Sequence, residues 1–205
     1  MKKIMFNDKY SLTQAVLEGR KTMTRRIIPI KLIQKYGHNK FNDRTYELIR
    51  HCTAYQPGEE VAVAQSYYTI KESHKDDIPV WANIVANTCD GEPGCYNKMF
   101  VKADLMPHRI RITNVKVERL QAISDEDCLK EGVQMFDTPI GKVYVAGGVY
   151  VGDDARLKIA KGMVNFSKPF NTPKEAFKIL IDKVSGKGTF ESNPYVFAYS
   201  FKLLD

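Results

Sequence analysis

The segment that decides the fold is "RIRITNVKVERL", residues 109–120. Ile110 and Ile112 alternate with arginines, and Val115 and Val117 alternate in the opposite phase. Alternation of this kind is typical of a strand with one buried face. The change of phase at residues 113–114 is typical of a β-bulge, which lets a sheet curl. This bulged strand, together with the other short strands expected, predicts a small mixed β-barrel with short helices, an α+β fold.

Helix signals lie on both sides of this strand. A serine or threonine cap with Gln, Asp or Glu three residues later predicts helices over 12–18, 125–131 and 173–185. Their N-caps would be Ser11, Ser124 and Thr172. Residues 195–204, "YVFAYSFKLL", alternate aromatic and smaller residues and predict a terminal strand.

Further short strands are expected from β-branched and aromatic residues. They are "EVAVAQSYYTI" at 60–70, "VWANIVA" at 80–86 and "KMFVKADL" at 98–105, with a hairpin around Gly147–Gly148. Strands and helices do not alternate regularly, which argues against a doubly wound parallel sheet. The glycine-rich "GGVYVG" and "SGKG" match neither the dinucleotide fingerprint nor the Walker A pattern, so no cofactor is expected.

The composition is that of a globular chain. Its 205 residues, 43% of them hydrophobic, suit one domain spanning residues 1–205. No apolar run approaches the ~18–20 residues of a membrane helix. The basic N-terminus lacks the apolar region of a secretory signal, which favours a cytoplasmic protein without a membrane partner.

Four cysteines lack the paired short spacing of a zinc site. Free thiols are the simplest interpretation of Cys52, Cys89, Cys95 and Cys128 in a cytoplasmic protein. A zinc site built from Cys89, Cys95, Cys52 and His51 is the alternative, with spacing wider than structural sites usually show. The sequence therefore predicts no metal.

Positive charge is concentrated near the N-terminus. The chain carries +7, with +8 in residues 1–50 and −1 in the remainder. A basic sector on a near-neutral body is typical of a protein with a phosphate-bearing partner, such as RNA or a nucleotide. Ordinary solvated lysines and arginines are the alternative, and nothing indicates the oligomeric state.

One basic stretch combines cations with hydroxyls: "LEGRKTMTRR", residues 17–26. In an extended chain Thr22, Thr24 and Arg26 would share one face, with Met23 and Arg25 on the other. A threonine hydroxyl needs a base to become a nucleophile. Lys21 could act as that base, since repulsion from Arg20, Arg25 and Arg26 would lower its pKa. A basic edge strand without chemistry is the alternative.

A second candidate is Glu131. It is expected in the last turn of the helix over 125–131, where a carboxylate opposes the helix dipole. That placement suits an acid that shares a proton, although an ordinary solvated glutamate would carry the same sequence.

Four blocks of the sequence together resemble a known family. They are "LEGRKTMTRR", "YQPGEEV", "MPHRIRITNVKVERLQAISDEDCLKEG" and "GKGTFESNPYVFAYSF". In this order they resemble the ASCH domain, a PUA-like β-barrel, in the version found in phage and prophage proteins. Against that pattern the segments 27–54, 70–98 and 135–170 look like insertions.

The resemblance to the family implies RNA binding, and the resemblance to one bacterial branch of the family implies catalysis. That branch is an amidohydrolase that removes the acetyl group of N4-acetylcytidine. Its catalytic lysine and threonine match Lys21 and Thr24, and its glutamate matches Glu131. Phage-type members carry a Trp and an Arg–Glu pair where this chain has Ala62, Ala64 and Gln65. Tyr67, Tyr68 or Trp81 could supply the missing aromatic ring.

Three functions stay open at this level. The first is an RNA- or nucleotide-binding module with a basic cleft. Its expected ligand-binding residues are Arg20, Thr22, Arg25, Arg26, Tyr67, Trp81, Arg109 and Arg111. The second is an amidohydrolase acting through Lys21, Thr24 and Glu131. The third is a basic surface for an acidic protein partner. A single surface formed by Arg20, Arg25, Arg26, Arg109 and Arg111 is expected for the first.

Overall fold

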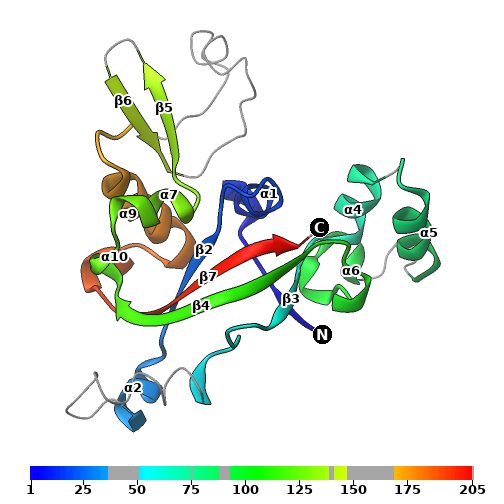
Figure 1. The fold of residues 1–205 in the computed structure, drawn as a ribbon, viewed down its shortest axis with the longest axis horizontal. Coiled ribbons are helices and arrows are strands. Elements are labelled where there is room, and N and C mark those ends of the chain that lie inside the picture. The colour runs from blue at the N-terminus through cyan, green and yellow to red at the C-terminus, as the bar shows by residue number, and fades with distance from the viewer. Residues whose placement is uncertain (37–50, 75, 88–92, 139–140, 147–168, 205) are drawn as a thin grey trace.

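The computed structural model describes residues 1–36, 51–74, 76–87, 93–138, 141–146 and 169–204. The fold is α+β, with a five-stranded mixed sheet and short helices (Figure 1). The strands are β1 (Lys2–Ile4), β3 (Glu60–Val63), β4 (Arg109–Arg119), β7 (Tyr195–Leu204) and β2 (Met23–Ile27), in that spatial order. Only β1 and β3 are parallel.

Two long antiparallel strands, β4 and β7, form the centre of the sheet. Their register shifts between Ile112 and Asn114, so the bulge expected at residues 113–114 is confirmed. The terminal strand is confirmed too, and Phe197, Tyr199 and Phe201 are buried on one face of it. Alternation therefore identified both strands correctly, and the change of phase in β4 located its bulge.

The sheet is open where a barrel was expected. Strands β1 and β2 lie at its two edges, and within the described segments no ladder joins them. A bulge increases twist and bending, but closure also needs a pairing of the edge strands. The bulge in β4 therefore accounts for a curled sheet and not for a closed one.

The main core lies between the sheet and three helices. Helix α7 (Asp125–Lys130) begins at Ser124, whose hydroxyl accepts from the Asp127 N–H at 3.1 Å. Helix α9 (Pro173–Ser185) begins at Thr172, whose hydroxyl accepts from the Glu175 N–H at 3.2 Å. Both expected caps are confirmed. The third helix, α10 (Thr189–Ser192), buries Phe190 near α9.

Helix α1 (Leu12–Leu17) occurs where expected, but its cap is different. Ser11 has φ 54°, ends the preceding 3₁₀ turn η1 (Asp8–Tyr10), and makes no side-chain capping bond. Gln14 donates to Glu18 instead of closing a capping box. The helix is held by burial of Leu12, Ala15 and Val16 in the core.

A second, smaller core replaces the strands expected after residue 63. Helices α4 (Tyr67–Ser73), α5 (Ile78–Asn87) and α6 (Pro93–Tyr96) surround it, followed by 3₁₀ turns η2 (Lys98–Phe100) and η3 (Ala103–Leu105). The strands expected over 67–70, 80–86 and 98–105 are wrong. This helical lobe lies beside one end of the sheet, as the green ribbons of Figure 1 show.

The remaining elements lie at the periphery. A hairpin joins β5 (Gln134–Thr138) and β6 (Gly141–Val145), and α2 (Ile30–Tyr36) follows β2. The 3₁₀ turn η4 (Leu120–Ala122) connects β4 to α7. The hairpin expected around Gly147–Gly148 lies outside the described residues. In the described part of the chain, no helix has the length and apolar character needed to cross a bilayer.

Candidate functional site

A small cavity opens beside the edge strand β2. Its volume is about 140 Å³. Lys21, Thr24 and Glu131 all line it, with Arg25 and Arg26. Its apolar lining comes from the loop after β1, from α1, from the end of β2 and from α9, and consists of Met5, Phe6, Leu12, Ile27, Phe177, Leu180, Ile181 and Val184. The three residues expected to carry catalysis therefore meet in one partly buried cavity.

The backbone fixes this meeting of β2 and α7. The N–H of Thr22 donates to the carbonyl of Lys130 at 3.0 Å, which ties the start of β2 to the end of α7. At that helix end Gly132 has φ +104°, and the N–H of Val133 donates back to the carbonyl of Cys128. This is a Schellman-type ending, which needs a residue with positive φ. Glu131 is thereby held at the C-cap, against Lys21.

Lys21 and Glu131 form a buried ion pair. Their Nζ and Oε2 atoms lie 2.7 Å apart, and only 2% and 6% of the two side chains is exposed. The same Nζ donates to the carbonyl of Glu131 at 2.7 Å. Burial lowers the pKa of Lys21, an effect that Glu131 opposes and Arg26 and Arg25 reinforce. The direction agrees with the sequence-based expectation, but desolvation and not arginine repulsion is the larger cause.

Arg25 is not part of a basic surface, which corrects the sequence-based expectation. Its side chain has 0% exposure and contacts three carboxylates: Glu118 at 2.7 Å, Asp127 at 2.8 Å and Glu131 at 3.0 Å. Lys116 pairs with Glu118 at 3.0 Å and with Asp127 at 3.2 Å. Arg25 and Lys116 hold the pKa of Asp127 below its ordinary value, through hydrogen bonds and charge, against the effect of its burial.

We call the six residues Lys21, Arg25, Lys116, Glu118, Asp127 and Glu131 the ion cluster. Its three cations and three carboxylates balance in charge. Because buried charges are costly unless paired, this balance explains how an edge strand tolerates a buried arginine. The ion cluster therefore stabilises the fold, and three of its members, Lys21, Arg25 and Glu131, also line the cavity.

Thr24 and Arg26 occupy the strand side of the cavity. Thr24 is 5% exposed, and its hydroxyl makes no hydrogen bond to any described residue. Arg26 donates to the carbonyl of Met5 at 2.6 Å, and because it is exposed and also lines the cavity, it lies at the rim. An unengaged hydroxyl beside a buried lysine is an arrangement from which a nucleophile can be activated.

Several expected ligand-binding residues lie elsewhere. Arg20 pairs with Glu18 outside the cavity lining. Thr22 lines a separate surface pocket with Lys116 and Lys130, so it does not share a site with Thr24. Tyr67 is buried in the helical lobe, where its hydroxyl accepts from the Lys102 N–H. Trp81, 41% exposed on α5, is not among the cavity residues either.

Arg109 and Arg111 are also separated from the cavity. They line a different cleft, between the sheet and the helical lobe. The single basic surface expected from Arg20, Arg25, Arg26, Arg109 and Arg111 is therefore wrong. The expected division of faces in residues 22–26 is wrong as well, because Thr24, Arg25 and Arg26 line one cavity while Thr22 lines another pocket. Spacing along a strand also does not show where two strands lie relative to each other.

The sequence analysis missed the apolar wall of the cavity and the acidic members of the ion cluster. Phe177 and Leu180 belong to the helix over 173–185, which the sequence analysis predicted from its N-cap without assigning these residues to a site. Asp127 served only as part of the capping signal of the helix over 125–131, and Glu118 gave no signal, because single acidic residues on a strand are common on surfaces.

The cysteines give no support for a zinc site. Cys52 and Cys95 are free thiols, and Cys95 is buried. Cys89 lies outside the described residues. Across the residues that the structure describes, no group of three or more His, Cys, Asp and Glu side chains could hold a metal. Burial raises the pKa of the Cys128 thiol to about 12, so it is no nucleophile at neutral pH.

Gly132 offers a test of the helix ending that holds Glu131. A Cβ at Gly132 would lie 3.0 Å from Leu12 Cδ2, in a backbone conformation that side chains rarely adopt. We expect Gly132→Ala to lower the free energy of unfolding by about 1–3 kcal/mol, measured by urea denaturation. Gly19→Ala is the matched control, because Gly19 also has positive φ but has no atom within 4 Å of its Cβ position. Equal losses of unfolding free energy in Gly132→Ala and Gly19→Ala would show that close approach to Leu12 contributes nothing to the destabilisation.

Comparisons with known proteins identify no relative: no family model, no curated protein and no solved structure matches the chain.

Proposed function

We propose that the protein is an amidohydrolase that removes an acyl group from the amino nitrogen of a nucleobase or nucleoside, with N4-acetylcytidine as the representative substrate. The observation that carries the proposal is the convergence of Lys21, Thr24 and Glu131 on one cavity. The ASCH-type resemblance of the sequence supports the same reaction.

The proposed steps use the three residues in sequence. Thr24 Oγ1 attacks the acyl carbon, and Lys21, in its neutral form, takes the hydroxyl proton. The C–N bond then breaks, and the leaving nitrogen receives a proton from Lys21 or through Glu131. Water hydrolyses the Thr24 ester, which releases the carboxylic acid and restores the hydroxyl. The burial that lowers the pKa of Lys21 supports its role as a base.

The size of the cavity supports a small reacting group. A cavity of about 150 Å³ holds a benzene-sized ring, and this one measures about 140 Å³. An acylated pyrimidine ring would place its acyl amide against Thr24, with its ring or acyl carbons against Phe177 and Leu180. A ribose would extend past the rim, where Arg26 is exposed.

The ASCH-type, PUA-like assignment of the fold is part of this proposal. It is supported by the bulged β4 strand, the long terminal strand and the order of the four sequence blocks. A module that binds RNA or a nucleotide without catalysis is the second candidate, supported by the net charge of +7. The burial of Arg25 favours the first candidate for this cavity, because Arg25 is not accessible to a phosphate.

The direct test is turnover of N4-acetylcytidine by the purified protein. We expect equal amounts of cytidine and acetate, followed by chromatography and NMR. Acetanilide is the matched control substrate, because it carries the same acyl group on an aromatic amine without the pyrimidine edge. Failure to release cytidine above the rate in buffer would exclude this substrate.

A further inference from the structure

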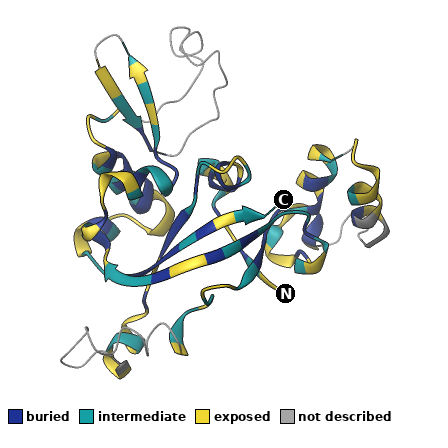
Figure 2. Cartoon of the chain, in the orientation of Figure 1, coloured by how far each residue is buried: buried dark blue, intermediate teal, exposed yellow. Residues whose placement is uncertain are grey.

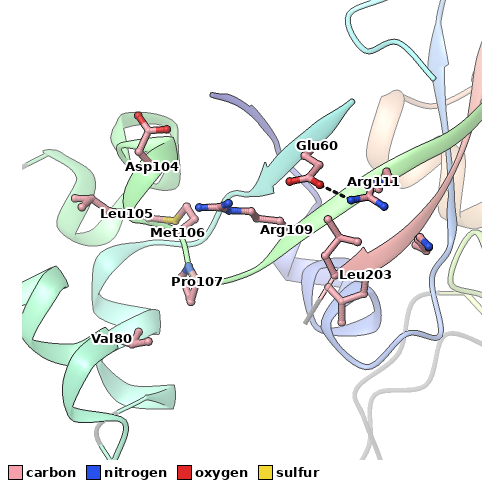
Figure 3. Close-up of a pocket in the computed structure, with 11 residues that line it drawn as sticks. Glu60, Val80, Asp104, Leu105, Met106, Pro107, Arg109, Arg111 and Leu203 are labelled. Atoms are coloured by element: carbon pink, nitrogen blue, oxygen red, sulfur yellow. Dashed lines mark hydrogen bonds and ion pairs between the residues drawn. The ribbon is translucent and has the colours of Figure 1, made fainter. Parts of the chain in front are cut away.

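A second, larger cleft lies at the other end of the sheet, between β4, β7 and the helical lobe. Its volume is about 810 Å³. One wall carries Arg109 and Arg111, and the facing wall carries Val80, Leu105, Met106 and Pro107 (Figure 3). Lys202 also lines the cleft. It shares no lining residue with the Lys21 cavity.

The strand register places the three cations on one face. Arg111 and Lys202 are direct partners in the β4–β7 ladder, with Glu60 on the other side of Arg111. Arg109 is two residues before Arg111, so its side chain points to the same face about 6.7 Å away. Figure 3 shows the Arg109 side chain reaching toward Met106, across the cleft.

Two of the three cations lack a carboxylate partner. Arg111 pairs with Glu60 at 2.5 Å, whereas neither Arg109 nor Lys202 forms an ion pair with any other described residue. The second acidic residue, Asp104, has a side chain that is 78% exposed. This contrasts with the ion cluster, where every cation is matched by carboxylates.

The burial pattern agrees with an open binding face. Along β7 Phe197, Tyr199 and Phe201 are buried on one face, while Lys202, on the other, is exposed. Figure 2 shows the mixture of buried and exposed residues along the strands of the sheet. The three cations and the apolar lobe together present two kinds of surface to one ligand: hydrogen-bond donors on one side and an apolar wall on the other.

We propose that this cleft binds a ribonucleoside monophosphate, with the phosphate on Arg109, Lys202 and Arg111 and the base against Leu105, Met106 and Pro107. Guanidinium and ammonium groups are the usual donors to phosphate oxygens. A volume of about 810 Å³ suits a ligand of this size, since such sites measure about 300–1,000 Å³. The site is independent of the proposed amidohydrolase reaction.

Isothermal titration calorimetry with the four common ribonucleoside monophosphates, and with their nucleosides, tests this site. At least one monophosphate should bind, with an affinity that falls as salt increases, while its nucleoside should bind about tenfold more weakly or not at all. Binding of the nucleoside as tightly as the monophosphate, or binding of no monophosphate, would overturn the proposal. A single-stranded RNA that binds when no monophosphate does would replace it with a polymer site.

Substitutions then assign the phosphate contacts. Arg109→Met and Lys202→Met should each weaken monophosphate binding about tenfold, the loss of one charge-assisted contact. Lys187→Met is the matched control, because Lys187 is an exposed lysine after α9, outside the cleft. Arg111 is not used, since its removal would also leave Glu60 unpaired. Equal affinities for Lys202→Met and Lys187→Met would overturn the assignment.

Thr24→Ala should bind the monophosphate as wild type does, which separates this site from the Lys21 cavity.

Discussion

Replacing Thr24 with alanine is expected to slow the release of cytidine from N4-acetylcytidine by about 10²–10⁴-fold, and Lys21→Met is expected to do the same. Thr24→Ala removes the atom that would bond to the acyl carbon, and Lys21→Met removes the base. Both effects should appear in kcat, because neither group acts mainly in binding. The measurement is initial rate against substrate concentration.

Thr22→Ala is the matched control for Thr24→Ala. It removes the same hydroxyl two residues away, from a side chain that lines a different pocket. Wild-type activity in Thr22→Ala and loss in Thr24→Ala would support the assignment, provided both variants unfold at similar temperatures. If Thr24→Ala releases cytidine as fast as Thr22→Ala, Thr24 is not the nucleophile.

The pH dependence of the same reaction reports on Lys21. Burial lowers the pKa of Lys21 from its ordinary 10.5, and a base acts only when deprotonated. The rate should therefore rise with pH and level off below the pH at which an exposed lysine titrates. A rate that keeps rising through pH 10.5 would indicate hydroxide or another base in place of Lys21.

Replacing Arg25 with methionine is expected to lower the free energy of unfolding by about 3–5 kcal/mol at neutral pH. The side chain has 0% exposure, and its removal would leave the buried carboxylate of Glu131 and the partly buried carboxylates of Glu118 and Asp127 short of a cation. Methionine keeps most of the volume, so the loss would report mainly on charge. Urea denaturation followed by circular dichroism measures it.

A control variant and the dependence of stability on pH make this second prediction specific. Arg26→Met changes an exposed neighbour and should cost no more than about 1 kcal/mol. The pKa of Asp127 is lowered in the folded protein, so its stabilising effect is present above its ordinary pKa of 3.8 and is lost as pH falls through the lowered value. Wild type should therefore lose more stability in acid than Arg25→Met does. Equal stability of the two arginine variants at neutral pH would contradict the ion cluster's structural role.

Local signals predicted much of the fold because their physics is local. The caps at Ser124 and Thr172 and the bulge at residues 113–114 depend on groups within a few residues of one another. The strand expected over 60–70 was right at its start and wrong after residue 63. Ser66 accepts from the Thr69 N–H at 3.1 Å and begins α4, a cap signal that the run of aromatic and β-branched residues obscured. Similarly, Pro79 lies in the first turn of α5, where proline is well tolerated.

The sequence by itself determined the chemistry available: a lysine and a threonine on one short segment, and a glutamate at a helix end. Only the tertiary structure decided which of these groups meet and which charges stay accessible. Strand alternation assigns Arg25 to a face, but the carboxylates that cover that face come from β4 and α7, about a hundred residues away. Arg109 and Arg111 likewise lie near Lys202 and not in the expected basic surface. Cross-strand neighbours depend on the register between distant segments, which spacing along the chain does not show.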